Sequence, residues 1–382
     1  MPPTQPPLSQ ILPPLICGTA TFNNLYNPTI TSIPSNSIIA SALARGIRAF
    51  DTSPYYGPSE TLLGTALAEP SVLKAHPRAT YQLLTKVGRI ANAEFDYSPA
   101  WIQYSVRRSL QRLRTGYLDV VYCHDVEFVS AAEVLVAVRE LRHIRDTQGT
   151  IKYIGISGYP VPLLAELAEM VLRETGEPLD VVMGYANFTL QNGTLQSRGL
   201  ERLRRAGVSV VPNASPLGMG LLRSKGVPVG GKGDFHPAPR ELRDKVLEAA
   251  RFVETKGEKL EVVAIRWALE QWAIQAAMLG GQGGIGVSVM GVSNLAELEE
   301  TMRVWNSVLD GLEVVGRSAE KDELQWSLER RKDIEGLAQG VWEILGTWKD
   351  FTWASPEVGY VNERTVKGVI EDSDSVAKDS KV

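Results

Sequence analysis

Short hydrophobic runs alternate along the chain with longer stretches in which apolar residues recur at helical spacing. The alternation can be followed eight times, and each hydrophobic run has the length of a strand. Strands that are buried on both faces of a parallel sheet are mostly apolar in this way. Because eight strand–helix units fit a closed barrel better than an open sheet, the pattern predicts an α/β protein with a (β/α)8 TIM barrel. The expected strands are residues 15–19, 47–51, 81–86, 118–124, 153–157, 181–185, 209–213 and 285–291.

The amphipathic stretches between these strands carry helix-start signals. Ser98 followed by Pro99 is typical of an N-cap and a first helical residue, and we expect Ser35 and Asn294 to cap helices as well. No G-x-G-x-x-G segment follows the first strand, which argues against a Rossmann fold. The expected helices are residues 35–45, 98–113, 131–145, 162–174 and 295–308.

Two segments interrupt the alternation. Residues 224–239 are rich in glycine, proline and charge, and we expect a long loop over the active face after the seventh strand. The barrel is expected to span residues 11–310, so residues 311–371 form a C-terminal extension with a helix and an aromatic part. This extension could lie across the barrel mouth or cover outer helices, and the sequence leaves both open. The polar residues 372–382 are expected to be a disordered tail.

Composition narrows the class of protein. Of the 382 residues, 44% are hydrophobic, which is enough for a full core, and the net charge of −4 argues against a nucleic-acid partner. The only cysteines, Cys17 and Cys123, lie in apolar runs, which favours a reducing compartment over a disulfide framework. We find no signal peptide and no membrane-spanning run, and we expect a cytoplasmic protein without a membrane partner. The sequence does not indicate an oligomeric state.

Four residues with chemically useful side chains stand at or just after the ends of expected strands: Asp51, Tyr56, Lys86 and His124. Catalytic groups of TIM barrels come from the C-terminal ends of different strands, so the fold would bring these four together. Taken singly, each has an ordinary explanation as a turn former, a packing ring, a solvated amine or a structural imidazole. Together they predict a proton-transfer site. A Cys123–His124 nucleophile pair is not expected, because neighbouring strand residues point to opposite faces.

The segments around these residues resemble those of the aldo-keto reductase family. DTSPYYG at residues 51–57 resembles D-T-A-x-x-Y-G, TKVG at 85–88 resembles T-K-x-G, and DVVYCH at 119–124 resembles D-x-x-x-x-H. GIS at residues 155–157 resembles the segment whose serine binds the nicotinamide carboxamide. The resemblance implies a nicotinamide cofactor and places Tyr56, rather than Tyr55, in the catalytic position.

Residues 213–222 (NASPLGMGLL) and 180–190 resemble the sugar dehydrogenase branch of that family more closely. Met183 stands where many members have a carboxamide-binding glutamine, and Gly158 replaces an asparagine that commonly follows the serine. The resemblance implies a small-molecule sugar substrate, an aldose of the D-arabinose, L-galactose or L-fucose type that is oxidised at C1 to its lactone. A general aldehyde or ketone reductase, a non-catalytic cofactor-binding member and a barrel aldolase that uses Lys86 remain alternatives.

The expected mechanism assigns one task to each group. A neutral phenol is a weak base, and the Lys86 ammonium would stabilise the phenolate of Tyr56. Asp51 would compensate the charge of Lys86, and His124 would orient the substrate oxygen. Protein side chains cannot accept a hydride, so the hydride must go to the cofactor.

The resemblance also implies cofactor contacts at the ends of several strands. Glu297 stands where NADP-preferring members place a basic residue, and the next basic residue is Arg303, so we expect NAD to be preferred and NADP to be possible. Tyr55, Asn187 and Asn213 are substrate candidates, although the two amides could equally satisfy loop backbone. No metal site is expected. The expected cofactor contacts are Gly18, Thr19, Ser157, Ser215, Leu217, Gly291, Ser293, Glu297 and Glu300.

Overall fold

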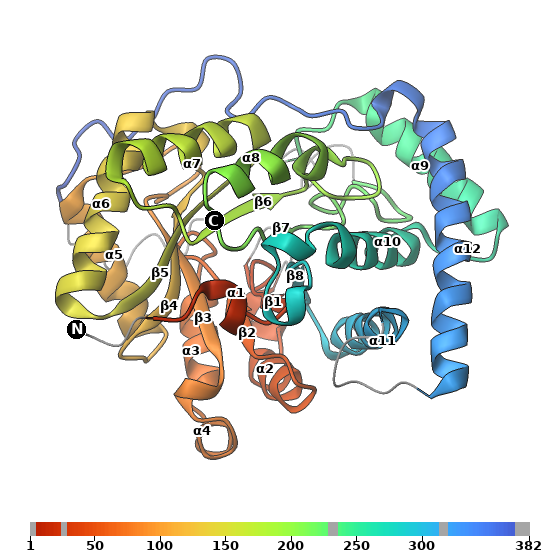
Figure 1. The fold of residues 1–382 in the computed structure, drawn as a ribbon, viewed down its shortest axis with the longest axis horizontal. Helices are drawn as coiled ribbons and strands as arrows, with labels where there is room; N and C mark the ends of the chain where they lie inside the picture. Colours follow the sequence, from red (N-terminus) through yellow and green to blue (C-terminus); the bar gives the residue numbers. More distant parts are fainter. Residues whose placement is uncertain (1–4, 24–28, 228–235, 313–319, 371–382) are drawn as a thin grey trace.

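Eight parallel strands close into a barrel in the order β1 to β8, with helices around the outside (Figure 1). This computed structural model describes residues 5–23, 29–227, 236–312 and 320–370. The predicted (β/α)8 TIM barrel is confirmed. The strands are β1 (Leu15–Gly18), β2 (Ala49–Asp51), β3 (Gln82–Val87), β4 (Leu118–His124), β5 (Ile151–Gly158), β6 (Val181–Tyr185), β7 (Asn213–Ala214) and β8 (Ser288–Gly291).

Two of the eight predicted strands match the structure to the residue. β4 and β6 have the predicted bounds, whereas β7 is much shorter than the predicted strand at residues 209–213. Val210 forms only an isolated parallel bridge to Val181, and the regular ladder with β6 and β8 begins at Asn213. The predicted extent of the seventh strand was therefore wrong.

Two of the three predicted caps are confirmed. Ser98 Oγ accepts a hydrogen bond from Trp101 N, and Asn294 Oδ1 accepts one from Glu297 N. Ser35 begins its helix instead of capping it, because Pro34 holds the cap position and makes no side-chain cap hydrogen bond. The helices of the barrel are α2 (Ser35–Ala44), α3 (Ser59–Leu67), α4 (Pro70–Ala75), α5 (Pro99–Arg112), α6 (Ala131–Gln148), α7 (Val161–Thr175), α8 (Leu200–Arg205), α9 (Arg240–Thr255), α10 (Leu260–Gln275) and α11 (Leu295–Gly311).

The barrel interior is a packed hydrophobic core that is closed at one end by the N-terminal helix α1 (Leu8–Ile11). Leu8 and Leu12 are fully buried and belong to the same cluster as Tyr122 and Met183. A second, larger cluster fills the layer between the strands and the outer helices. The residues singled out from the sequence lie toward the opposite end, where the strands terminate.

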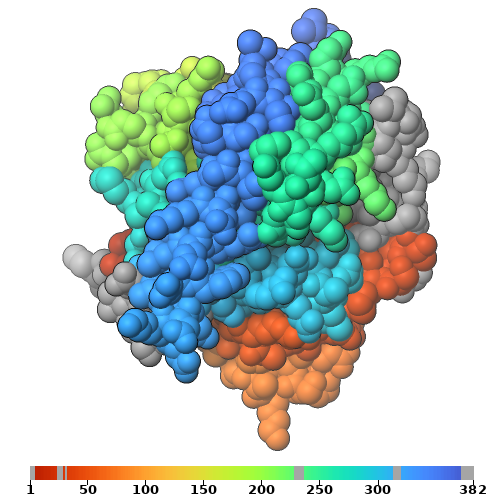
Figure 2. Space-filling model, turned by 90° about the vertical axis from the view of Figure 1, so that its right-hand side faces the viewer, coloured from red at the N-terminus to blue at the C-terminus, as the bar shows by residue number. Residues whose placement is uncertain are grey.

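The C-terminal extension begins with α12 (Lys321–Leu345), which packs against α9, α10 and α11 (Figures 1 and 2). Buried ion pairs hold α12 against α10. Glu270 of α10 lies 3.3 Å from Arg266 and 2.9 Å from Arg331 of α12, and Arg266 also reaches Ser327 of α12. A buried carboxylate shared by two guanidiniums needs both partners, so this contact fixes where α12 lies.

After α12, the chain turns and runs across the loops that follow β3 to β6, seen in dark blue along the top of Figure 1. Gln191 Nε2 donates to Trp348 O at 2.8 Å, and the Trp353 ring stacks on Tyr159 at 4.6 Å. Asn362 exchanges two hydrogen bonds with the backbone of Phe95. The extension thus covers outer helices, which is one of the two placements considered from the sequence, and its later part contacts the loops that follow β3 to β6. The predicted tail, 372–382, and residues 228–235 of the predicted loop lie outside the described residues.

Candidate active site

Asp51 and Lys86 form a buried ion pair at the ends of neighbouring strands β2 and β3. Lys86 Nζ donates to Asp51 Oδ1 at 2.6 Å and to Thr52 O at 2.9 Å. The Lys86 and Asp51 side chains are only 1% and 6% exposed. Burial raises the pKa of Asp51, and the nearby Lys86 opposes that shift. A buried pair of this kind holds an ammonium in one place inside the barrel mouth.

Tyr56 and His124 lie beside this pair. Lys86 Nζ is 4.8 Å from the centroid of the Tyr56 ring, and the Tyr56 and His124 rings are 5.8 Å apart at 90°. Tyr56 is half-buried, so its ring lies at the boundary between the barrel and the outside. The structure therefore brings together the four residues that the sequence singled out.

His124 is held uncharged. Burial lowers the pKa of its imidazole to about 3, and Lys86 and Arg89 act in the same direction while Asp125 opposes them. Its Nδ1 lies 3.1 Å from Ser53 Oγ, and its Nε2 lies 3.6 Å from Asp125 Oδ2. A neutral imidazole can donate one hydrogen bond and accept another, which suits it to orienting an oxygen.

A partly buried cation beside the four residues was missed by the sequence reasoning. Arg89 pairs with Asp125, stacks on Tyr55 at 3.8 Å from the ring centroid, and donates to the Tyr55 hydroxyl at 3.0 Å. Burial would lower the pKa of Arg89, but Asp125 and its other neighbours raise it. The sequence feature that could have identified Arg89 as a site residue is its position three residues after Lys86, at the end of the same strand. Asp125 follows His124 directly and has a φ of 55°.

Glu127 is a further buried acid at this end of the barrel. Burial, reinforced by Asp125, raises the pKa of Glu127 to about 8. Its Oε1 accepts hydrogen bonds from Tyr159 N and from Ser355 Oγ in the C-terminal extension, both at 3.0 Å. A Cβ atom on Gly158 would lie 2.4 Å from Glu127 Oε2. The glycine that replaces the family's asparagine thus leaves room for this carboxyl group.

The expected cofactor residues lie at the ends of β1, β5, β7 and β8, and β7, β8 and β1 are neighbours in the barrel. Thr19 Oγ1 donates to Asp51 O at 3.0 Å, so this hydroxyl also ties β1 to β2. Ser157 is buried and lies opposite His124 in the β4–β5 ladder. Ser215 has a φ of 58°, and its Oγ accepts a hydrogen bond from Met219 N. Leu217 packs on the edge of the outer core.

The start of α11 is shaped by its own acidic residues. Glu297 accepts a hydrogen bond from Ser293 N at 2.8 Å, and its own backbone N–H donates to Asn294 Oδ1, which caps the helix. Gly291 is exposed at the end of β8, and Glu300 is exposed with Arg303 3.7 Å away. The carboxylate of Glu297 therefore occupies the first turn, where a phosphate would otherwise find free N–H groups.

The two substrate-candidate amides differ in whether their side-chain polar atoms already make hydrogen bonds to the backbone. Asn187 donates to Tyr159 O at 2.6 Å and to Tyr185 O at 2.9 Å, which corresponds to the loop-supporting alternative. Asn213 donates to Phe188 O at 2.8 Å, but its Oδ1 is buried with no hydrogen-bond partner among the described residues. This oxygen is a free acceptor at the end of β7.

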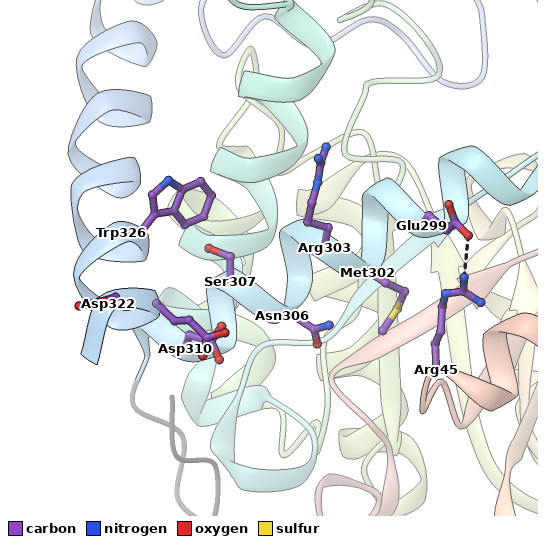
Figure 3. Close-up of a pocket in the computed structure, with 10 residues that line it drawn as sticks. Arg45, Glu299, Met302, Arg303, Asn306, Ser307, Asp310, Asp322 and Trp326 are labelled. Atoms are coloured by element: carbon purple, nitrogen blue, oxygen red, sulfur yellow. Dashed lines mark hydrogen bonds and ion pairs between the residues drawn. The ribbon is translucent and has the colours of Figure 1, made fainter. Parts of the chain in front are cut away.

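Two other features do not contribute to this site. Burial raises the pKa of Cys123 to about 12, so its thiol is unsuited to act as a nucleophile beside His124. A cavity of about 760 Å³ lies instead on the outer wall of the barrel, between α11 and α12 (Figure 3). Its lining includes Arg45, Glu299 and Trp326, none of which belongs to the predicted site.

Comparison with known proteins places the chain in a family. A model of the aldo/keto reductase family matches residues 14–316. The chain belongs to the aldo-keto reductase family. It is 42% identical over 288 residues to D-arabinose 1-dehydrogenase of Saccharomyces cerevisiae, covering 75% of this chain and 81% of that protein. It is 29% identical over 344 residues to L-galactose dehydrogenase of Arabidopsis thaliana, covering 88% and 92%.

These relatives support the sugar dehydrogenase branch that the sequence motifs indicated. The chain also resembles the solved structure of a glycerol dehydrogenase from Gluconobacter oxydans, with a TM-score of 0.58, 22% identity, and coverage of 92% of this chain and 97% of that one. That likeness supports the fold alone. The protein is an oxidoreductase of this family.

Metal-binding clusters and membrane-spanning helices are both absent from the part of the chain that the structure describes. It contains no group of three or more histidine, cysteine, aspartate or glutamate side chains that could hold a metal ion. None of its helices is long and apolar enough to cross a membrane.

Proposed function

We propose that this protein is an NAD(P)-dependent aldose 1-dehydrogenase that oxidises a sugar of the D-arabinose, L-galactose or L-fucose type at C1 to its aldonolactone. The observation that carries the proposal is the geometry of Asp51, Tyr56, Lys86 and His124 in a chain whose relatives are named as aldose dehydrogenases. A cytoplasmic location stays a prediction, with which the two free, buried cysteines agree.

Tyr56 is the proposed general base. Lys86, held by Asp51, lies close enough to the Tyr56 ring to favour its phenolate over the neutral phenol. The phenolate takes the proton of the anomeric hydroxyl as C1 is oxidised, and such help contributes roughly 10²- to 10⁴-fold to a rate. His124 donates to the same oxygen and fixes its position.

A bound nicotinamide would supply the hydride acceptor. The residues present fit it in one respect. The Asn213 Oδ1 is a buried acceptor with no hydrogen-bond partner among the described residues, suited to a carboxamide N–H or a sugar hydroxyl. A Cβ atom on Gly18 would lie 3.1 Å from Val289, and one on Gly291 would lie 3.1 Å from Thr21, so these two proposed contact positions leave no room for a larger side chain. Ser157, Ser215, Leu217 and Ser293 are the other proposed contacts.

We further infer that NAD is preferred over NADP. Glu297 places a carboxylate on the first turn of α11, and Glu300 adds a second negative charge on the next turn. A carboxylate repels a 2′-phosphate but accepts a hydrogen bond from a free 2′-hydroxyl.

The mouth of the site also suits a polar substrate. Arg89 and Asp125 place a partly buried charged pair next to Tyr55 and His124, where a sugar hydroxyl could exchange hydrogen bonds. Sites of this kind reject analogues that leave the polar groups unpaired. Tyr55 and Asn187 are the other proposed substrate contacts.

The test is absorbance at 340 nm with purified protein, NAD or NADP, and a panel of aldoses. NADH formation with a pentose or 6-deoxyhexose, together with a lactone product identified by NMR, is expected. Consumption of NADPH with aldehydes, but no reaction with any sugar, would instead assign the protein to the general reductases.

A further inference from the structure

Ser53 places a buried hydroxyl between the backbone of the catalytic loop and the imidazole of His124. Its Oγ lies 3.1 Å from His124 Nδ1 and 3.1 Å from Tyr55 N. Ser53 is fully buried, and His124 is 5% exposed. In the D-T-A-x-x-Y-G pattern this position is an alanine, which has no hydroxyl to offer.

The direction of the hydrogen bond between Ser53 and His124 follows from counting protons. A backbone N–H can only donate, so Tyr55 N donates to Ser53 Oγ. The Ser53 hydroxyl proton then needs an acceptor, and His124 Nδ1 is at hydrogen-bond distance. If Nδ1 carried the proton instead, the buried Ser53 O–H would lose that acceptor, which is costly. The arrangement that satisfies every group has Ser53 donating to an unprotonated Nδ1.

The other ring nitrogen faces a charged pair. His124 Nε2 lies 3.6 Å from Asp125 Oδ2, too far for a direct hydrogen bond, and Asp125 is already paired with Arg89. Asp125 therefore favours a proton on Nε2 without fully engaging it. That N–H is left able to donate to a substrate oxygen.

We propose that Ser53 is a positioning residue that fixes His124 in the tautomer with its proton on Nε2 and aims that N–H at the reacting oxygen. Its effect on catalysis rests on the function proposed above, whereas the hydrogen bond itself does not. The two can be tested separately.

The first test is ¹⁵N NMR of histidine-labelled, cofactor-free protein, in which the four histidines are few enough to assign by substitution. We expect Nε2 of His124 to be protonated and Nδ1 to be a hydrogen-bonded acceptor. In Ser53→Ala, the Nδ1 resonance should move to the position of a free acceptor. A proton on Nδ1 in the unmodified protein, or an unchanged spectrum in Ser53→Ala, would overturn the proposal. This result does not depend on which substrate the enzyme uses.

The second test is a double-mutant cycle on kcat/KM. Ser53→Ala should lower activity roughly 3- to 10-fold in the native background and should have no effect in His124→Ala, because the hydroxyl acts through the imidazole. An equal loss in both backgrounds would show a merely structural role and refute the proposal. Ser109→Ala is the matched control, since Ser109 is a buried serine of α5 whose Oγ has no hydrogen-bond partner among the described residues.

Discussion

Replacing Glu127 by glutamine should remove a large pH-dependent cost to the stability of the fold. Glu127 is buried, and its pKa is raised to about 8 by burial and by Asp125. Glutamine has nearly the same shape, and its oxygen can still accept from Tyr159 N and Ser355 Oγ. The substitution therefore changes the titration of this site while keeping the hydrogen bonds to the C-terminal extension.

The direction in which the unfolding free energy changes with pH follows from which state binds more protons. In the unfolded chain Glu127 loses its proton near the ordinary glutamate pKa of 4.5, whereas the folded protein keeps it until about pH 8. Between these values the folded state binds more protons, so the free energy of unfolding falls as the pH rises. With each pKa unit contributing about 1.4 kcal/mol, the cost grows by about 4 kcal/mol between about pH 5 and pH 9. Glu127→Gln lacks this loss.

The assay is urea unfolding followed by tryptophan fluorescence at several pH values. Because groups that do not interact with Glu127 titrate alike in both proteins, the difference in unfolding free energy reports on Glu127 together with Asp125, the carboxylate that interacts with it. Between about pH 5 and pH 9, we expect the unfolding free energy of Glu127→Gln to rise by about 4 kcal/mol relative to that of the native protein. Glu343→Gln on the exposed face of α12 serves as the control and should run parallel to the native protein. If the unfolding free energies of Glu127→Gln and the native protein differed by the same amount at every pH, the reasoning would be refuted.

Three further substitutions test separate parts of the account. Lys86→Met should lower kcat at least ~100-fold, and retained activity would contradict the role of the ammonium. Because the substitution leaves Asp51 buried without its partner, it should also destabilise the fold by about 3–5 kcal/mol in urea unfolding. Glu297→Arg should raise the ratio of kcat/KM with NADP to kcat/KM with NAD by about 10-fold. An unchanged ratio would show that this carboxylate does not discriminate between the two forms of the adenosine ribose. Trp353→Ala should remove a stacking contact with Tyr159 of about 1 kcal/mol and speed proteolytic cleavage within the extension, which a gel time course would measure.

Much of the barrel could be predicted because its signals are local. Mostly apolar runs defined β4 and β6 to the residue, and Ser98 and Asn294 capped their helices as expected. The short β7 could not be predicted, because the regular ladder is set by partners in β6 and β8 and not by the run itself. The path of the extension likewise depends on contacts between residues far apart in sequence, such as Trp353 with Tyr159.

The proposed catalytic group was visible in the sequence because each member stands at or just after the end of a strand, and the barrel converts that position into proximity. The residues around it were harder to recognise. Arg89, Ser53 and Glu127 act through the neighbours they touch, and those contacts exist only after the loops have folded. Asn187 shows the reverse case, since a plausible substrate amide is engaged with loop carbonyls.

The central claim is that Tyr56, supported by Lys86, moves the proton during oxidation of an aldose. The most direct measurement compares NADH formation by the native protein and Tyr56→Phe with the best sugar of the panel, alongside NAD binding by fluorescence. The account predicts that the variant binds NAD normally and loses at least ~100-fold in kcat. A Tyr56→Phe enzyme that oxidises the sugar at the native rate would contradict it.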